Sequence, residues 1–204
     1  MKMIKKVFIV MILLLSFSLI ACKKNEEVKP KEKEKTNQTQ EVTETKEEVK
    51  AIVVYFSRTN NTERIANFIK EITNCDSYEI EALIPYTDDD IKYYTDCRAD
   101  REQADPNARP EIGSAEIDLS QYDIIYLGYP IWHGQAPKIM YTFVEGHDLS
   151  NKTIIPFCTS ASSGIGTSAT NLAKSANGAI FLDGRRFSST ANKSEVESWL
   201  EGLK

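Results

Sequence analysis

Short apolar runs separated by helical patterns constrain the fold of this chain more than any other feature. Residues 51–56 and 123–128 are rich in β-branched side chains and too short for helices, which is typical of strands buried on both faces of a parallel sheet. The predicted strands are 51–56, 78–83, 123–128, 152–158 and 179–182, and the predicted helices are 62–72, 139–144, 168–175 and 194–203. This alternation predicts the α/β class, with a doubly wound five-stranded parallel sheet and helices on both faces.

Residues 84–118 interrupt the alternation, and we call them the excursion. They are charged, contain tyrosines and three prolines, and connect the second predicted strand to the third. Connections of this length are uncommon in a compact domain unless they serve a function. We therefore expect the excursion to have a functional role.

The first residues resemble an export signal. Three lysines precede an apolar run from Val7 to Ala21, which has the length of a signal-peptide core and is shorter than the roughly 20 residues of a membrane span. The run ends in Leu19-Ile20-Ala21-Cys22, which is similar to the lipobox of bacterial lipoproteins. We expect residues 1–21 to be a signal peptide and Cys22 to be lipidated, so that the protein is exported and held on a cell membrane. A plain signal peptide with an incidental cysteine is the alternative.

Residues 22–50 are predicted to be a disordered tether and residues 51–204 a single domain. The tether holds eight lysines, eight glutamates and almost no large apolar side chain, so it cannot bury enough surface to fold. The whole chain has a net charge of −5 and the leader has three lysines and no acid, which leaves −8 on the domain. This charge argues against nucleic acid as a partner. It is compatible with a basic protein or a small cationic or neutral substrate.

Three cysteines, Cys75, Cys97 and Cys158, lie in the predicted domain. In an exported protein two of them could form a disulfide, for which Cys75 and Cys97 are the pair to test; free buried thiols are the alternative. The chain has no C-x-x-C motif and only two histidines, so we expect no metal site.

Three loops follow predicted strands at the carboxyl edge of the sheet, where open α/β sheets bind ligands. The first, Ser57–Thr62, places hydroxyl and amide side chains before a helix whose start a Thr or Asn is expected to cap. Such a helix start attracts anions. The loop lacks the lysine and the spacing of a P-loop, so a phosphate monoester fits better than a triphosphate. An ordinary helix cap is the alternative.

The second and third loops are predicted to surround a flat ligand. In the second, 129–137, Trp132 could stack on a ring, although packing on the neighbouring helix is the alternative, and His133 could titrate or hydrogen-bond near the ligand. The third, 159–166, imitates a dinucleotide fingerprint. It follows the fourth strand instead of the first, however, and no tyrosine follows it to complete a short-chain dehydrogenase. We expect its small residues to let the backbone approach a ligand closely.

Four motifs in this order resemble the flavodoxin family, in particular a bacterial branch with a Tyr-Pro-Ile-Trp loop. The motifs are Val54–Thr62, Arg109–Ile112, Tyr122–Trp132 and Pro156–Ser160. The resemblance implies the strand order 2-1-3-4-5 and FMN as the cofactor, bound between the first and third strands. Two departures are Asn60, which replaces a common glycine but tolerates the left-handed conformation, and His133, which replaces a second aromatic residue.

The resemblance also implies a set of cofactor-binding residues. The implied residues are Ser57, Arg58, Thr59, Asn60, Asn61 and Thr62 in the phosphate loop, Pro130, Ile131, Trp132, His133 and Gly134 along the ring, and Thr159, Ser160, Ser162, Ser163 and Gly164 at the pyrimidine edge. His133 is the only candidate for a catalytic role.

Three functions are compatible with these features. The first is an electron carrier that docks to a redox protein. The second is an FMN-dependent quinone or NAD(P)H oxidoreductase, which acts on a small substrate, since the same fold serves both. The third is a lipoprotein that binds flavin or a phosphorylated ligand without turnover.

Overall fold

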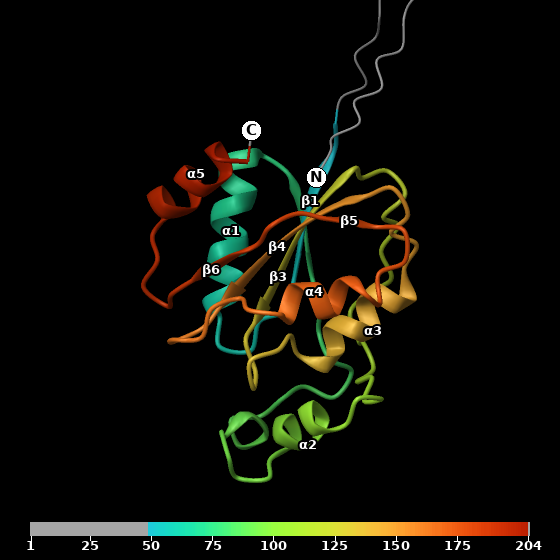
Figure 1. Ribbon diagram of the computed structural model, residues 1–204, viewed down its shortest axis with the longest axis vertical. Helices are drawn as coiled ribbons and strands as arrows, with labels where there is room; N and C mark the ends of the chain where they lie inside the picture. The colour runs from blue at the N-terminus through green and yellow to red at the C-terminus, as the bar shows by residue number, and fades with distance from the viewer. Residues whose placement is uncertain (1–48, 204) are drawn as a thin grey trace, which may run out of the picture. The chain divides into compact units, whose positions relative to one another are not determined.

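The computed structural model describes residues 49–203, in which strands and helices alternate (Figure 1). The predicted signal peptide, Cys22 and nearly all of the predicted tether lie outside the described residues. The elements in chain order are β1 (Ala51–Tyr55), α1 (Asn61–Thr73), β2 (Asp76–Glu79), the 3₁₀ turn η1 (Asp89–Ile91), α2 (Arg98–Ala104), β3 (Ile124–Pro130), α3 (Lys138–Gly146), β4 (Thr153–Thr159), α4 (Ser168–Ala173), β5 (Ile180–Phe181), β6 (Arg185–Phe187) and α5 (Lys193–Glu201).

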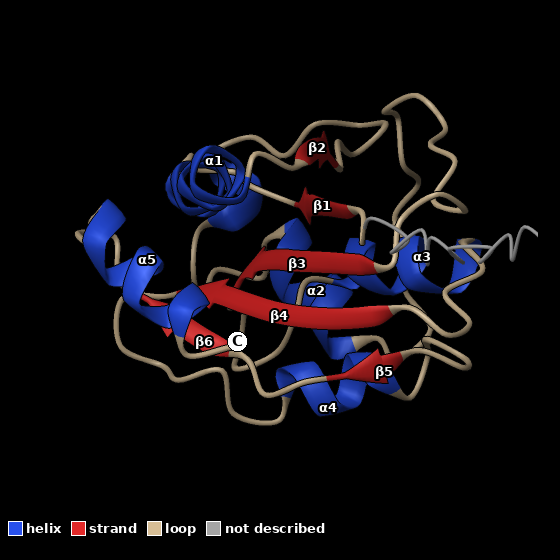
Figure 2. Cartoon of the chain, turned by 90° about the horizontal axis from the view of Figure 1, so that it is seen from above, coloured by secondary structure: helices blue, strands red, loops and turns tan. Residues whose placement is uncertain are grey.

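The sheet is parallel throughout, with the strand order β2-β1-β3-β4-β5 (Figure 2). This order confirms the predicted arrangement 2-1-3-4-5. In the register of the three central strands, Val54 lies beside Leu127, and Leu127 lies beside Pro156. Because the strands point the same way, the loops that follow β1, β3 and β4 emerge from one edge of the sheet.

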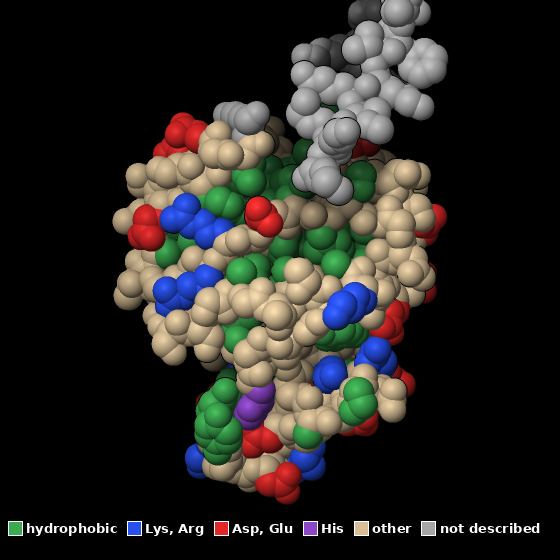
Figure 3. Space-filling view, in the orientation of Figure 1, with side chains coloured by type: hydrophobic (Ala, Val, Ile, Leu, Met, Phe, Trp, Pro, Cys, Tyr) green, Lys and Arg blue, Asp and Glu red, His purple; other side chains and the backbone are tan. Residues whose placement is uncertain are grey.

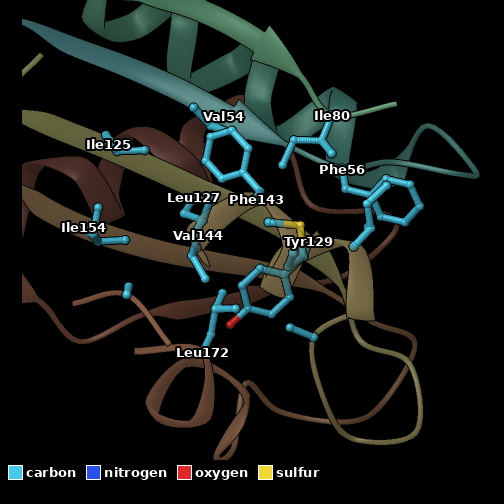
Figure 4. Close-up of a cluster of buried hydrophobic side chains, with 14 of the residues drawn as sticks. Val54, Phe56, Ile80, Ile125, Leu127, Tyr129, Phe143, Val144, Ile154 and Leu172 are labelled. Atoms are coloured by element: carbon cyan, nitrogen blue, oxygen red, sulfur yellow. The ribbon is translucent and has the colours of Figure 1, made fainter. Parts of the chain in front are cut away.

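Successive residues of each central strand face two different helical layers. In β1, Val54 packs into the layer that holds α3 and α4, whereas Val53 packs into the layer that holds α1 and α5. Figure 4 shows the first layer, in which Phe143 and Val144 of α3 and Leu172 of α4 lie against the strands. Both faces of the sheet are therefore covered, as the uninterrupted apolar strands predict.

The second strand ends earlier than its alternating pattern predicts. The predicted strand covers residues 78–83, but the parallel ladder of β2 ends at Glu79. The chain stays extended and changes partner: Leu83 N–H donates to Glu111 O at 2.8 Å and Gly113 N–H donates to Glu81 O at 2.8 Å. A pattern with a period of two records that a segment is extended, and it does not record which neighbour the segment pairs with.

The last position of the sheet is divided between two short strands, β5 and β6, which both pair with β4. The predicted strand 179–182 corresponds to β5 alone. Pro156, in the facing part of β4, has no N–H to donate to an edge strand. A Cβ on Gly184 would lie 2.7 Å from the carbonyl oxygen of Pro156. The ladder is therefore broken where these two residues meet.

The excursion, to which the sequence analysis assigns no helix or strand, contains η1 and α2 (Figure 1). The α2 helix begins with a capping box at Cys97 and Asp100 and carries an Arg98–Glu102 ion pair at 2.6 Å. Cys97 at the start of the helix and Ala99 in its first turn are both buried. Figure 3 shows acidic and basic side chains interspersed on the drawn face of the molecule.

All three cysteines of the described residues are free thiols in the structure, which corresponds to the second of the two alternatives from the sequence. Cys97 and Cys158 are buried, and Cys75 is partly exposed. Burial raises the pKa of Cys158 to about 12, so this thiol is protonated at neutral pH.

Gly128 in β3 provides a test of the packing between strands. A Cβ at this position would lie 2.1 Å from Cζ of the buried Phe157 ring. We expect Gly128→Ala to lower the free energy of unfolding by about 2–3 kcal/mol through overpacking, measured by urea denaturation. Gly146→Ala is the control, because no atom lies within 4 Å of its Cβ position, and it should cost nothing. Equal stability of the two variants would contradict this packing.

Candidate cofactor site

Three loops meet at the carboxyl edge of the sheet: Ser57–Thr62 after β1, Pro130–Gly134 after β3, and the loop that begins at Thr159 after β4. Thr62 Oγ1 lies 2.8 Å from Thr159 Oγ1, and both side chains are buried. Ile131 N–H donates to Thr159 O at 2.9 Å. These two bonds join all three loops, so the structure brings the three predicted segments together.

A cavity of about 280 Å³ opens between these loops. Seven of the predicted residues line it, together with two that the sequence did not single out, Ala161 and Ser189. The seven are Thr59, Asn61, Pro130, Ile131, Trp132, Thr159 and Ser160. Thr62 lies buried below the loops, and Ser162, Ser163 and Gly164 are exposed.

The start of α1 lacks the side-chain cap that the sequence predicts. Asn60, the residue before the helix, has φ 59°, and its side chain makes no capping hydrogen bond. The cap is missing for a geometric reason, because the backbone before a capped helix is normally extended, whereas the backbone of Asn60 is left-handed. The first backbone N–H groups of a helix have no partner within the helix. At α1 they are therefore available to an anion.

Ser57 has the same unmet hydrogen-bonding capacity. Its Oγ is buried and has no hydrogen-bond partner among the described residues. A buried hydroxyl without a partner costs roughly 1–3 kcal/mol. The phosphate loop therefore combines uncapped helix N–H groups with a hydroxyl that lacks a partner, as expected for a loop that accepts an anion.

Arg58 points from the phosphate loop to the excursion. Its guanidinium donates to Tyr86 O through Nε, and its Nη2 lies 2.6 Å from Asp88 Oδ1. The side chain lines a second cavity, of about 460 Å³, beside the end of β2. Arg58 therefore links the phosphate loop to the excursion.

Trp132 lies at the junction of the cavity and an aromatic cluster. Its ring meets Phe56 edge to face at a centroid distance of 5.6 Å and Tyr86 at 5.1 Å. The indole is only partly buried, and it lines the cavity of about 280 Å³ together with Thr59 and Thr159. The cluster supports the indole ring from the side while the side chain still borders the cavity.

The residues after Trp132 form a tight turn. Trp132 N–H donates to Gln135 O at 3.0 Å and Gln135 N–H donates to Trp132 O at 2.9 Å. The two central residues, His133 and Gly134, have φ values of 48° and 75°, the signs that a type I′ turn requires. His133 Nε2 lies 2.6 Å from Asp100 Oδ1, so the imidazole points to α2.

Two arginines that the sequence analysis did not assign to the site hold its outer loops. Arg186 in β6 donates from Nη2 to Ser160 O and Ala161 O, both at 2.7 Å. Arg64 in α1 donates to Ser189 O at 2.6 Å and also to Ala191 O. Both arginines bind backbone carbonyls, and such contacts produce no recognisable motif in the sequence, because any residue type supplies a carbonyl. The only signals in the sequence were that Arg186 follows the predicted strand 179–182 and that Arg64 lies in the first turn of a predicted helix.

Residues 49–203 contain neither a metal cluster nor a membrane-spanning helix. No group of three or more His, Cys, Asp or Glu side chains there could hold a metal ion. Each helix in that range is too short or too polar to span a lipid bilayer.

The buried hydroxyl pair of Thr62 and Thr159 tests how the loops are joined. Thr62→Val should lower the free energy of unfolding by about 1–3 kcal/mol, because it leaves the Thr159 hydroxyl buried without a partner. The Thr62→Val/Thr159→Val double variant should recover part of the loss, and exposed Thr170→Val should change little. Urea denaturation measures all three, and strictly additive losses would show that the two hydroxyls are not coupled.

Comparisons with known proteins agree with this geometry. A family model described as Flavodoxin matches residues 50–203. A solved structure from Bacteroides eggerthii, described as an inferred flavoprotein, is 37% identical, covers 76% of this chain and 98% of its own, and has a TM-score of 0.71. A similarly described protein from Bacteroides uniformis is 36% identical, with coverages of 75% and 98% and a TM-score of 0.72.

A more distant structure shares the fold. A flavoprotein from Lactobacillus acidophilus, solved in complex with FMN, is 22% identical, covers 75% of this chain and 99% of its own, and has a TM-score of 0.57. No curated protein matches the chain significantly. Because the family match spans nearly all of the described domain, the chain belongs to the flavodoxin family.

Proposed function

We propose that this protein binds FMN in the cavity between the three loops and carries electrons to or from a protein partner, while a lipid at Cys22 holds it on a membrane outside the cytoplasm. The observation that carries the proposal is the uncapped start of α1, which borders the cavity at Thr59 and Asn61. The unpartnered hydroxyl of Ser57 belongs to the same phosphate loop and lines the neighbouring cavity of about 460 Å³. Membership of the flavodoxin family supports FMN as the group that meets these donors.

The residues around the cavity fit the parts of FMN. Thr59 and Asn61 lie at the α1 end, where the phosphate would bind. Pro130, Ile131 and Trp132 offer an apolar wall to the isoalloxazine ring. Ser160 and Ala161 border the cavity at the end of β4, where the polar pyrimidine edge would lie, and Arg186 holds their backbone carbonyls in place.

The bound FMN would supply the redox chemistry, and the protein would set its affinity and its potential. The net charge of −8 on the domain disfavours any further negative charge at the site and therefore lowers the potential of the cofactor. An acidic protein also attracts a partner with a basic surface and repels an acidic one. These features favour an electron carrier.

One observation favours the alternative of an FMN-dependent oxidoreductase that acts on a quinone or on NAD(P)H. The second cavity, of about 460 Å³, is larger than the proposed FMN cavity, and Phe56 and Tyr86, which line it, both contact Trp132. A small substrate could occupy this cavity close to the ring wall. Export weakens the NAD(P)H version, because that cofactor is mainly cytoplasmic.

An anaerobic reductive titration of the FMN-loaded protein distinguishes the two functions. A carrier should be reduced in two separate one-electron steps and should turn over neither quinone nor NAD(P)H rapidly. A single two-electron step with rapid turnover of either substrate would establish the oxidoreductase instead. A protein that binds FMN with no electron exchange would be the binding lipoprotein. A colourless protein that does not bind FMN would contradict both redox functions.

Trp132→Ala should weaken FMN binding about tenfold, because it removes the stacking surface along the ring. Fluorescence titration of the apoprotein with FMN measures the dissociation constant. Trp132→Phe should retain most of the affinity, and Tyr141→Ala on α3, outside the cavity lining, should not change it. Unchanged affinity of Trp132→Ala would show that the ring binds elsewhere.

The anchor is proposed from the leader and can be tested separately. Cys22→Ser should remove the lipid and move the protein from the membrane fraction to the soluble fraction, with FMN content unchanged, because the cavity lies wholly within the described domain. Fractionation and metabolic labelling with a fatty acid measure both effects. A membrane-bound, unlabelled Cys22→Ser protein would show that another element anchors the chain.

A further inference from the structure

The α2 helix of the excursion makes three polar contacts with the turn Trp132–Gln135 and the residue that follows it. Asp100 Oδ1 lies 2.6 Å from His133 Nε2. Gln103 Nε2 donates to Trp132 O at 2.9 Å and to Ala136 O at 3.2 Å. Both side chains come from the same short helix: Asp100 reaches a central residue of the turn, and Gln103 reaches the carbonyls at its start and just after its end. No other described helix makes this set of contacts to the turn backbone and to the imidazole.

Asp100 is itself held rigidly. Its Oδ2 accepts hydrogen bonds from Thr95 N–H at 2.9 Å and Cys97 N–H at 3.4 Å. Burial acts to raise the pKa of Asp100, but the His133 hydrogen bond and these two backbone donors outweigh burial and lower the pKa. The carboxylate is therefore charged and fixed in one orientation when it meets the imidazole.

The imidazole of His133 is held from a second direction. The Tyr93 ring stacks on it at a centroid distance of 4.4 Å and an interplanar angle of 17°, and Tyr94 meets it edge to face at 5.5 Å. The charged and titratable groups that face His133 are thus Asp100, Tyr93 and Tyr94, all from the excursion. None of these three groups comes from the strands of the sheet or from the helices that cover it.

The turn needs such support because its backbone is unfavourable for one of its residues. His133 has φ 48°, and a left-handed conformation at a residue other than glycine costs of the order of 1–3 kcal/mol. Such a conformation persists only where the surroundings hold it. Asp100 hydrogen-bonds the imidazole of His133, and Gln103 donates a hydrogen bond to the carbonyl of Trp132, the residue before it.

We propose that Asp100 is a positioning residue that acts with Gln103 to hold the Trp132–Gln135 turn in the conformation that receives the flavin ring. The inference rests on the proposed function, because it assumes that FMN binds along this turn. It assigns the excursion a role in pre-organising the site, which raises affinity by reducing the ordering required on binding. The Asp100 carboxylate also adds negative charge beside the turn, which disfavours reduction of the cofactor.

The test is a double-mutant cycle on Asp100 and His133, with FMN affinity and midpoint potential as the two measurements. Asp100→Ala removes the carboxylate, and His133→Asn removes the imidazole but keeps a residue that tolerates positive φ. Loss of the Asp100 cap on α2 occurs in both Asp100→Ala proteins of the cycle, so it cancels from the coupling. Asp105→Ala is the matched control, because Asp105 ends the same helix and its hydrogen bonds stay within residues 101–108.

We expect each single variant to bind FMN about tenfold more weakly and the double variant to bind no more weakly than the worse single variant. Asp100→Ala should also raise the midpoint potential of bound FMN, whereas Asp105→Ala should leave both quantities unchanged. A purely structural role would weaken the oxidised and reduced complexes equally and leave the potential where it was.

Three results would overturn the inference. Additive losses of affinity would show that Asp100 does not act through His133. An unchanged midpoint potential in Asp100→Ala would show that Asp100 only stabilises α2. The same loss of FMN affinity in Asp105→Ala would show this as well. In each of these cases the wild-type protein still binds FMN and the proposed function stands. Wild-type protein that does not bind FMN would instead overturn the proposed function, and this inference with it.

Discussion

The parallel pairing of β1, β3 and β4 is the constraint on which the site depends. Because the three strands run in the same direction, their carboxyl ends lie together although they are separated by long stretches of sequence. The Thr62–Thr159 hydroxyl contact and the Ile131–Thr159 backbone bond then join the loops at that edge. The position of the cavity thus follows from the sheet, and its chemistry follows from the few residues that the loops add.

Those loops contain unfavourable local features where a cofactor would bind. Asn60 and His133 both have left-handed backbones, one before α1 and one in the turn after β3. The first leaves the start of α1 without a side-chain cap, and the second depends on contacts from the excursion. Ser57 adds a buried hydroxyl without a partner among the described residues. A ligand with an anionic end and a flat ring would meet the unpaired donors and use the positioned turn.

The sequence was informative where burial determines the pattern. The apolar runs of β1, β3 and β4 and the helices α1 and α5 lie where the sequence predicts them. Their side chains form the two core layers on either face of the sheet, and burial there sets the apolar pattern. The loops at the carboxyl edge could also be predicted, since a strand end and a run of hydroxyl residues are both visible in sequence. The seven predicted residues that line the cavity, Thr59 and Trp132 among them, came from that reasoning and from the family resemblance.

Other features could not be predicted, for identifiable reasons. The pattern of residues 78–83 could not show that the chain changes partner after Glu79. The family resemblance indicated that Asn60 tolerates a left-handed backbone, but a Thr or Asn before α1 could not show that this backbone leaves the helix without its side-chain cap. Arg186 acts through backbone carbonyls, and Asp100 and Gln103 act across the fold from a segment with no regular pattern. Such contacts depend on three-dimensional placement, for which residue type alone is no guide.

The central claim is that FMN binds with its phosphate at the start of α1 and its ring along the Trp132 turn. The most direct measurement is an amide ¹H–¹⁵N NMR titration of the protein with FMN, with riboflavin as the ligand that lacks the phosphate. We predict large shifts at Asn61, Thr62 and Glu63 with FMN but not with riboflavin, and shifts at Trp132–Gln135 with both ligands. Shifts confined to Glu81–Tyr86, around the second cavity, would contradict the account.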